Sequence, residues 1–388
     1  MKNIFLLLSF FCCSLSFGQA NPRYAVVDAK MEAIPTAATT STQTIANYIN
    51  ANFKTESDKI RAAYYWTASN ISYDIPGMYA VNFKETVQQK IARTLKTRKG
   101  VCIHYASVFN DLAQKIGIQS YIIEGYNKQN GKVSNLAHAW IAAKIDKKWF
   151  IFDATWGSGY VNNGKFYKKL NKAYFKAEPS KIIASHIPFD YLWQFLNYPI
   201  TNNEFYEGKI QINKDKKYFD FENEIIKYNV LPEAEQLFAS VERIEKNGLK
   251  NDMILERYEG KKQQLVYLRQ KTNIEKLNAI VIEMNKAVVL LNEFIRYRNN
   301  KFNPALSDSE ISSMIETPKE ILINCQNNIY SVGSVGSQNK ANAESIKKSI
   351  GVALSQAEEH SLFVKNYLSK SKIVRKTMFS KAVQFRVR

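Results

Sequence analysis

The segments TRKGVCIHYASVFNDLAQKIG, residues 97–117, and AHAWIAAKIDKKWFIFD, residues 137–153, decide the fold of the first half of the chain. In the first segment, apolar side chains at spacings of three and four predict a helix with one buried face. They are Tyr105, Val108, Phe109, Leu112 and Ile116. Gly117 marks the end of this helix. Cys102 therefore lies in its first turn, where unpaired N–H groups and the helix dipole stabilise a thiolate nucleophile.

Three strand-like runs follow this helix. They cover residues 120–125, 137–145 and 148–153, with a turn-rich segment over residues 127–135 between the first two. A short polar turn joins the second run to the third and fixes their register. With residues 145–146 in the loop, His138 lies opposite Asp153, and with residues 146–147 the two are diagonal neighbours. Both registers place these two side chains on the same face of the sheet.

An imidazole beside a carboxylate is the base and orienting acid of a catalytic triad. We expect His138 to take the Cys102 proton and Asp153 to fix the imidazole tautomer, while Cys102 attacks an amide or ester carbonyl. His104 lies about 200° around the helix from Cys102 and is expected to point away. His186 has no acid in a fixed sequence relation to it. We interpret His104 and His186 as structural histidines.

These residues resemble the core signature of the transglutaminase-like superfamily. The matching segments are Gly100-Val101-Cys102-x-x-Tyr105-Ala106, His138-Ala139-Trp140 and Asp153-Ala154-Thr155-Trp156. Residues 66–74 resemble the segment before the cysteine in bacterial members, and residues 179–194 resemble the kyphoscoliosis-peptidase-like branch. The resemblance covers about residues 45–200.

The resemblance implies an α+β core of the papain/transglutaminase type, in which the helix carrying Cys102 packs on an antiparallel sheet carrying His138 and Asp153. It also implies a cysteine peptidase or a protein-glutamine acyltransferase that acts on protein or peptide amides through a thioester. The contact between the start of the Cys102 helix and the sheet face rests on the resemblance alone. The main alternative is a weakly active or inactive protein that binds a peptide in the same cleft, with its helical half docking a partner.

Such a site needs an oxyanion donor, most simply the backbone N–H of Cys102 with one side-chain partner. Trp66 and Tyr73 are the candidates for that partner. Trp140 and Trp156 lie in apolar runs, and we interpret them as core residues or as walls of the cleft. The sequence contains no calcium loop of the EF-hand kind, and we expect neither a metal nor another cofactor.

The first twenty residues have the pattern of a cleaved secretory signal. A lysine precedes an apolar run over residues 4–17, and residues 18–20 offer small side chains to a signal peptidase. The run is too short for a lasting membrane span, and a retained anchor is the alternative. We therefore expect a periplasmic or extracellular protein. Two cysteines then remain, Cys102 and Cys325, either as free thiols or joined in one disulfide.

The net charge of +19 is distributed along the chain. Export argues against a nucleic-acid partner, whereas a cell-wall polymer or anionic lipid headgroups would suit the charge. We expect the substrate to be a protein or a cell-wall peptide.

The sequence predicts a catalytic domain over residues 21–205 and a mainly helical domain over residues 206–388. Apolar residues in the second domain alternate at spacings of three and four through three heptads. They are Ile274, Leu277, Val281, Met284, Val288, Leu291 and Ile295. Three heptads are marginal for an autonomous coiled coil, so an antiparallel helical hairpin or bundle is favoured. We expect it to have a packing or partner-binding role.

Overall fold

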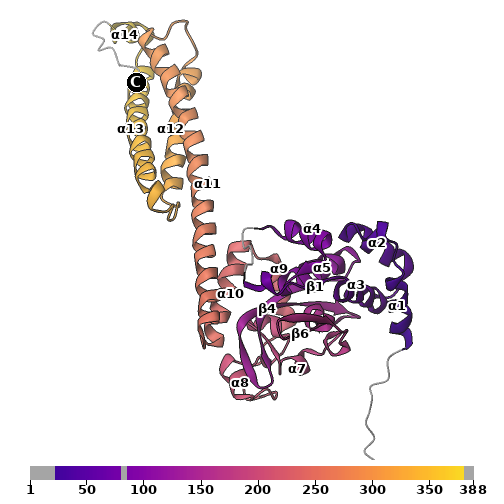
Figure 1. The fold of residues 1–388 in the computed structure, drawn as a ribbon. Helices are drawn as coiled ribbons and strands as arrows, with labels where there is room; N and C mark the ends of the chain where they lie inside the picture. Colours follow the sequence, from indigo (N-terminus) through magenta and orange to yellow (C-terminus); the bar gives the residue numbers. More distant parts are fainter. Residues whose placement is uncertain (1–21, 80–84, 380–388) are drawn as a thin grey trace, which may run out of the picture. The chain divides into compact units, whose positions relative to one another are not determined.

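The computed structural model describes residues 22–79 and 85–379, which form two compact units (Figure 1). Unit 1 comprises the described residues up to Leu231 together with Ala239–Tyr258, and unit 2 comprises Pro232–Phe238 and the described residues from Glu259 onward. The predicted signal sequence lies outside the described residues. Within the described ranges, no helix combines the length and the apolar character that crossing a membrane requires.

Unit 1 opens with helices that lead to the predicted nucleophile. They are α1 (Pro22–Glu32), η1 (Thr36–Thr39), α2 (Thr42–Asn52), α3 (Glu56–Asn70), η2 (Pro76–Tyr79), α4 (Val87–Thr97) and α5 (Cys102–Lys115). Side-chain caps at Ser41, Thr55 and Thr86 satisfy N–H groups at the starts of α2, α3 and α4. The predicted helix is therefore confirmed as α5, with Cys102 as its first residue.

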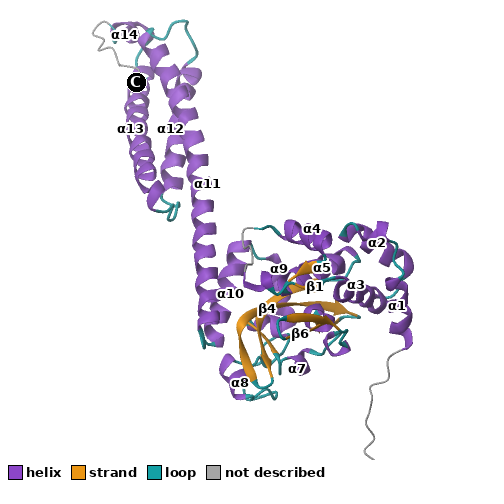
Figure 2. Cartoon of the chain, viewed as in Figure 1, coloured by secondary structure: helices purple, strands orange, loops and turns teal. Residues whose placement is uncertain are grey.

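The central sheet of unit 1, whose strands are orange in Figure 2, is antiparallel. Its four strands follow the order β5-β4-β3-β8. Their bounds are Ser120–Gln129 for β3, Lys132–Ile145 for β4, Lys148–Phe152 for β5 and His186–Pro188 for β8. Alternate residues of β4 enter different cores, because a strand directs successive side chains to opposite faces. Ala139 and Ile141 pack with α5, whereas Trp140 belongs to a cluster with Leu192 and Phe195. The predicted α+β architecture is thus observed.

Two-residue turns close both long hairpins of this sheet. Asn130 and Gly131 join β3 to β4, and Asp146 and Lys147 join β4 to β5. All four residues have positive φ, as the backbone twist of a tight hairpin requires. The turn-rich segment predicted over residues 127–135 was too long, because Asn-Gly alone makes the reversal and the flanking polar residues extend the strands.

Smaller elements surround the predicted site. They are β1 (Ser72–Tyr73), β2 (Lys99–Gly100), α6 (Ala154–Ser158), β6 (Gly159–Asn162), β7 (Lys165–Lys168), η3 (Lys172–Tyr174), α7 (Pro179–Ile182) and η4 (Tyr191–Gln194). Strands β1 and β2 pair in parallel, and β6 and β7 form an antiparallel hairpin. Because β2 directly precedes Cys102, its pairing with β1 holds the chain that enters α5.

Unit 1 extends past the predicted boundary at residue 205. Helices α8 (Asn202–Glu207) and α9 (Phe221–Val230) and the later part of α10 (Glu233–Asn247) supply apolar side chains to the sheet unit. Ile225 joins the cluster around Trp140, and Val241 and Ile244 pack in a cluster with Tyr126 and Ile187. A buried ion pair between Arg243 and Asp190, 2.6 Å apart, accompanies this packing. These helices therefore complete the second face of the sheet.

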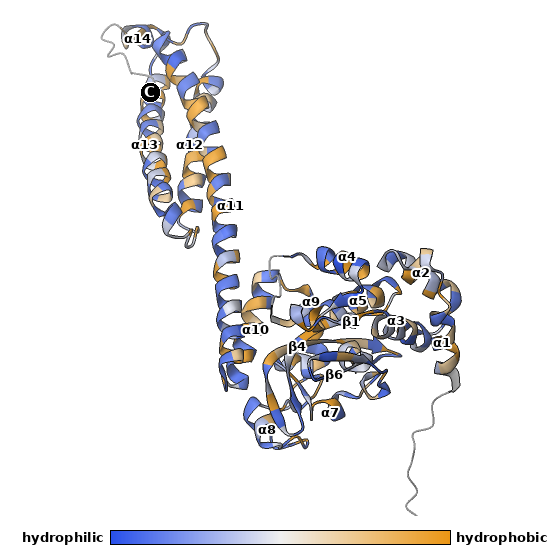
Figure 3. Cartoon of the chain, viewed as in Figure 1, coloured by the Kyte–Doolittle hydropathy of each residue, from blue (hydrophilic) through white to orange (hydrophobic). Residues whose placement is uncertain are grey.

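Unit 2 is a helical bundle. Its long helices are α11 (Asp252–Asn299), whose first turns belong to unit 1, α12 (Asp308–Ile329) and α13 (Ser337–Leu368), and α14 (Lys372–Thr377) follows them. The seam predicted on α11 faces its neighbours, because Leu277, Leu291 and Ile295 are buried in clusters with residues of α12 and α13. Hydrophobic residues run along α11 and α12 in Figure 3. The seam thus packs a bundle, as favoured over an autonomous coiled coil.

Candidate active site

The chain entering α5 is held by two hydrogen bonds from the segment of β1. The N–H of Ser72 donates to the Arg98 carbonyl at 2.8 Å, and the N–H of Asp74 donates to the Gly100 carbonyl at 3.0 Å. Gly100 is required by close packing, since a Cβ there would lie 2.5 Å from the Cβ of His104. Cys102 follows as a half-buried free thiol in the first turn of α5. The nucleophile candidate therefore occupies a fixed position.

His104 caps the same helix. Its Nδ1 accepts a hydrogen bond from the N–H of Val101 at 3.1 Å, and the side chain is buried. Burial, aided by the positive charge of Arg93, lowers the pKa of His104 and favours the neutral imidazole. His104 thus has the structural role that its place on the helix predicted.

His138 and Asp153 lie next to each other on one face of the sheet, as the two predicted registers implied. The observed partners Ile141–Phe152 and Ala142–Ile151 correspond to the Asp146-Lys147 loop, the register in which His138 and Asp153 are diagonal neighbours. His138 Nε2 lies 2.7 Å from Asp153 Oδ2, and both side chains are buried. The predicted imidazole–carboxylate pair is confirmed as a contact.

Asp153 is fixed at both of its oxygens. It stands just after β5 as the N-cap of α6, so its Oδ1 accepts the N–H groups of Thr155 at 2.8 Å and Trp156 at 3.0 Å. Burial alone would raise the pKa of Asp153, but the positive charge and hydrogen bond of His138 and the hydrogen bond of His186 hold it well below its usual range. The carboxylate is therefore ionised and cannot rotate freely.

His138 connects this carboxylate to the thiol. Burial works to lower the pKa of His138, but the Asp153 carboxylate and a hydrogen bond with the Cys102 side chain outweigh it and raise this pKa. Because Nε2 is bound to Asp153, Nδ1 is the ring nitrogen left for the thiol. The Cys102 side chain is among the groups that raise the pKa of His138, so the thiol lies near the ring, as the family resemblance implied. The arrangement favours a protonated His138.

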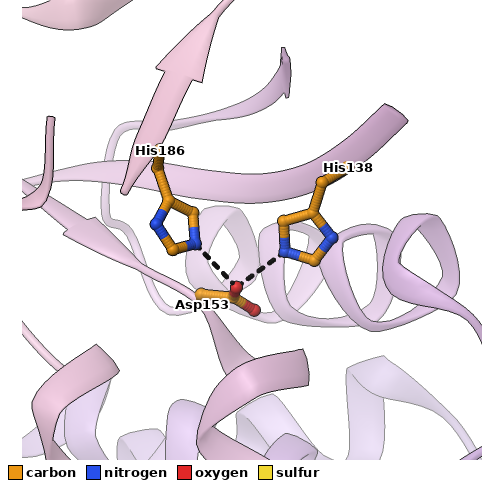
Figure 4. Close-up of side chains that lie close together, drawn as sticks. All are labelled: His138, Asp153 and His186. Atoms are coloured by element: carbon orange, nitrogen blue, oxygen red, sulfur yellow. Dashed lines mark hydrogen bonds and ion pairs between the residues drawn. The ribbon is translucent and has the colours of Figure 1, made fainter. Parts of the chain in front are cut away.

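His186 joins the same carboxylate, which corrects the prediction that it lacks an acid partner. Its Nε2 lies 3.2 Å from Asp153 Oδ2 (Figure 4). Strand β8 carries His186 to this point by pairing with β3, where His186 stands beside Asn127. The pairing joins segments about sixty residues apart, and spacing along the chain does not reveal it. The available signal was the family resemblance of residues 179–194, which includes His186 but does not indicate its partner.

The four aromatic candidates lie in different surroundings. Trp140 is 2% exposed, with its ring centroid 5.8 Å from that of His138, and so forms a buried wall of the site. Trp156 is half-buried, with its ring 4.7 Å from His186 and 5.8 Å from His138. Both match the prediction of wall residues, although Trp156 lies on α6 and not in a strand.

The two oxyanion candidates differ in access. Tyr73 is half-buried on β1 and pairs in register with Gly100, two residues before Cys102. Trp66 is completely buried in the core beneath α5. Its indole cannot reach a substrate, so the candidate role of Trp66 is not supported, and Tyr73 remains.

His138, Asp153 and His186 also form the kind of group that can bind a metal, with ligand atoms within 4.8 Å of one another. Tetrahedral zinc ligands at about 2.0 Å from the ion would stand about 3.3 Å apart. The 2.7 Å between His138 Nε2 and Asp153 Oδ2 is clearly shorter than that separation and fits an N–H···O hydrogen bond, and the 3.2 Å from His186 Nε2 is also within hydrogen-bonding range. The three side chains are therefore arranged for two imidazoles to hydrogen-bond to the Asp153 carboxylate.

Residues 43–154 match the family model described as the transglutaminase-like superfamily. The kyphoscoliosis peptidase of Homo sapiens is 31% identical over 159 residues, which cover 39% of this chain and 24% of that protein. The Mus musculus protein of the same name is 31% identical over 156 residues, 38% of this chain and 23% of its own length. This chain thus spans about a quarter of the length of these relatives.

A solved structure called "Crystal structure of a TGase" aligns with 17% identity over 42% of this chain and 40% of its own, at a TM-score of 0.25. The family-model match over residues 43–154 contains Cys102, His138 and Asp153. This part of the chain is therefore similar to the transglutaminase-like superfamily.

Proposed function

We propose that unit 1 is an exported thiol enzyme that acts on amide bonds of protein or peptide substrates. The observation that carries this proposal is the 2.7 Å hydrogen bond between His138 and the ionised Asp153, with the Cys102 thiol near enough to raise the pKa of His138 as well. A buried imidazole between a thiol and a carboxylate is the arrangement that activates a cysteine nucleophile.

In the first half of the reaction, Cys102 Sγ bonds to the carbonyl carbon of the amide. The oxyanion that develops is stabilised by N–H donors at the start of α5, most simply the N–H of Cys102 itself. The C–N bond then breaks, and the imidazolium of His138 gives its proton to the leaving amine. The products are a free amine and a thioester on Cys102.

In the second half, water or another amine attacks the thioester carbon and passes a proton to His138. The C–S bond breaks and Cys102 leaves as the thiolate. Water as the nucleophile makes the enzyme a peptidase, and an amine makes it an acyltransferase. The name of the relatives, kyphoscoliosis peptidase, supports hydrolysis.

Export is part of the proposal, and residues 1–20 support it through their lysine, apolar run and small residues. In that location a chain with a net charge of +19 would meet acidic surfaces such as cell-wall polymers. A cell-wall peptide or an extracellular protein is the substrate class that this setting suits.

The proposal is tested by alkylating the intact protein with iodoacetamide at about pH 6, where an ordinary thiol is protonated. Cys325 is an internal reference, because burial raises the pKa of its thiol. We expect Cys102 to react at least about 100-fold faster than Cys325, and His138→Ala to slow Cys102 to the rate of an ordinary accessible thiol. Asn135→Ala, an exposed change on the same strand, serves as the matched control.

Equal and slow labelling of the two cysteines would remove the basis for an enzyme and leave a peptide-binding cleft. If Cys102 is reactive, release of amine from peptide and glutamine-donor substrates, with a Cys102→Ala control, separates a peptidase from an acyltransferase.

A further inference from the structure

We propose that His186 is a positioning residue, which holds Asp153 through Oδ2 and thereby limits how strongly His138 retains its proton. The inference rests on the proposed function, because it assigns His186 a part in activating Cys102. It arises from one observation that the three-residue scheme does not use, namely two imidazoles on a single carboxylate oxygen (Figure 4).

The hydrogen bonds around Asp153 are complete. Two backbone N–H groups of α6 bind Oδ1, and the Nε2 atoms of His138 and His186 bind Oδ2. A carboxylate can accept about four hydrogen bonds in all, so each position is filled. Removing the His186 donor leaves one Oδ2 position without a partner in a buried place, where such a loss is costly.

The tautomer of His186 follows from its neighbours. Because Asp153 is ionised, Nε2 of His186 must carry the proton in their hydrogen bond. Nδ1 of a neutral ring is then an acceptor, and Ser185 Oγ lies 2.8 Å from it. The same hydroxyl also donates to the Ile182 carbonyl at 3.2 Å, so its single proton is shared between two acceptors. Asp153 therefore selects the Nε2–H form, and Ser185 supports it by offering a proton to Nδ1.

The surroundings keep His186 neutral. Its ring is 1% exposed and packs against the rings of Trp140 at 5.2 Å, Trp156 at 4.7 Å and Tyr174 at 6.0 Å. The titratable groups that face it are Asp153, His138 and Tyr174. Burial, together with the charge of His138, outweighs Asp153 and lowers the pKa of His186. His186 therefore donates a hydrogen bond without adding a second positive charge.

A neutral donor has a specific effect on the pair beside it. The N–H of His186 neutralises part of the charge on Oδ2, so the imidazolium of His138 is stabilised less than by Asp153 alone. The same bond fixes the plane of the carboxylate that orients His138. His186 therefore makes His138 a better proton donor to the leaving amine, since its proton is held less tightly.

The test compares His186→Phe, which keeps a ring but has no N–H, with His186→Gln, whose terminal amide can reach the same oxygen. The rate of Cys102 alkylation is measured in the full chain from about pH 5 to pH 10. At the alkaline end of this profile, the rate changes as His138 loses its proton. We expect His186→Phe to move this change to higher pH by about half a unit to one unit. His186→Gln should return it toward the wild-type position.

A second measurement reads the tautomer directly. In protein labelled with ¹⁵N-histidine, we expect His186 to show the neutral Nε2–H signature from about pH 6 to pH 8. Ser185→Ala should weaken the preference for this tautomer. A neutral Nδ1–H ring, or a cation in this range, would overturn the proposal.

The outcomes separate this inference from the proposed function. If Cys102 reacts quickly through His138 but the Phe profile superimposes on the wild type, only the role of His186 is lost. If both variants fold, as judged by melting temperature, and Gln does not restore the profile, the role is also lost. If Cys102 is unreactive in the wild type, the proposed function fails, and the role of His186 in activation falls with it.

Discussion

The two units each bury a histidine beside a charged side chain, with opposite results. In unit 1, His138 faces the Asp153 carboxylate, and its pKa is raised despite burial. In unit 2, burial and then the Arg298 guanidinium lower the pKa of His360 to about 4. The same residue type is therefore a proton carrier in one unit and a neutral packing element in the other. The neighbouring charge, and not burial, makes the difference.

The cysteines repeat this contrast. Cys102 begins a helix and contacts an imidazole, whereas Cys325 lies inside the bundle, with its sulfur 3.8 Å from the Ile280 carbonyl. Both are free thiols, which answers the question of a disulfide that the sequence left open. Reactivity is accordingly expected in unit 1 alone.

The largest effect is expected from removing the charge that distinguishes the two histidines. Asp153→Asn keeps the shape of the side chain but leaves two imidazole donors facing an amide, so the His138 tautomer is no longer fixed. We expect the rate of Cys102 alkylation, or of turnover, to fall about 1,000-fold or more. Asp111→Asn, which removes an ion pair with Lys115 on the surface of α5, is the control. Equal rates in the two variants would show that Asp153 does not orient the base.

Stability should respond to alkaline pH in unit 1. The folded state raises the pKa of His138 above its ordinary value of 6.5, so this group stabilises unit 1 fully below pH 6.5 and progressively less as pH rises through the folded value. The free energy of unfolding should fall by up to about 1.4 kcal/mol per pH unit in that window. Denaturant titrations of wild type and His138→Gln measure it, and a slope retained in the variant would assign the effect elsewhere.

Unit 2 should respond in the opposite direction. The unfolded chain protonates His360 near pH 6.5 and the folded chain only near pH 4, so stability is lost as pH falls between these values. The loss should reach about 3 kcal/mol at most. Hydrogen exchange of α13 amides reports it. His360→Phe should flatten the dependence, and an unchanged slope would mean that another group carries it.

The smallest expected effect contrasts two glycines. Gly131 has a φ of +75° in its hairpin turn, so Gly131→Ala should destabilise unit 1 by about 1 kcal/mol. Gly351 lies within α13 with open space around it, so Gly351→Ala should stabilise unit 2 by about 0.5–1 kcal/mol. Chemical denaturation measures both, and the same sign at both positions would contradict the backbone argument.

Local patterns predicted much of this molecule. The α5 helix, its glycine end and the shared sheet face of His138 and Asp153 follow from spacing within about twenty residues, where each side chain's face is set by its own element. The sequence left two β4–β5 registers open, and the structure has the one with Asp146 and Lys147 in the turn. The Asn130-Gly131 turn was also readable from sequence but was taken as part of a longer loop.

What could not be predicted depends on distant pairing. His186 reaches the site only because β8 pairs with β3. Ile225 and Val241 pack on the second face of the sheet, and that packing can be identified only when the sheet itself is known. Trp66 illustrates the opposite error. Its residue type made it a candidate for the cleft, but the structure encloses its indole completely in the core. Burial is a property of the assembled unit, whereas periodicity belongs to the segment.

Asp153 belongs at once to the proton network and to the backbone of α6, whose first N–H groups it caps. Helix α6 should therefore tolerate few substitutions, even though it does not contain the thiol. Residues 154–158 carry no reactive group, yet a change there that unwinds the turn would release Oδ1 and tilt the base. Selection for chemistry and selection for folding act here on the same few peptide bonds.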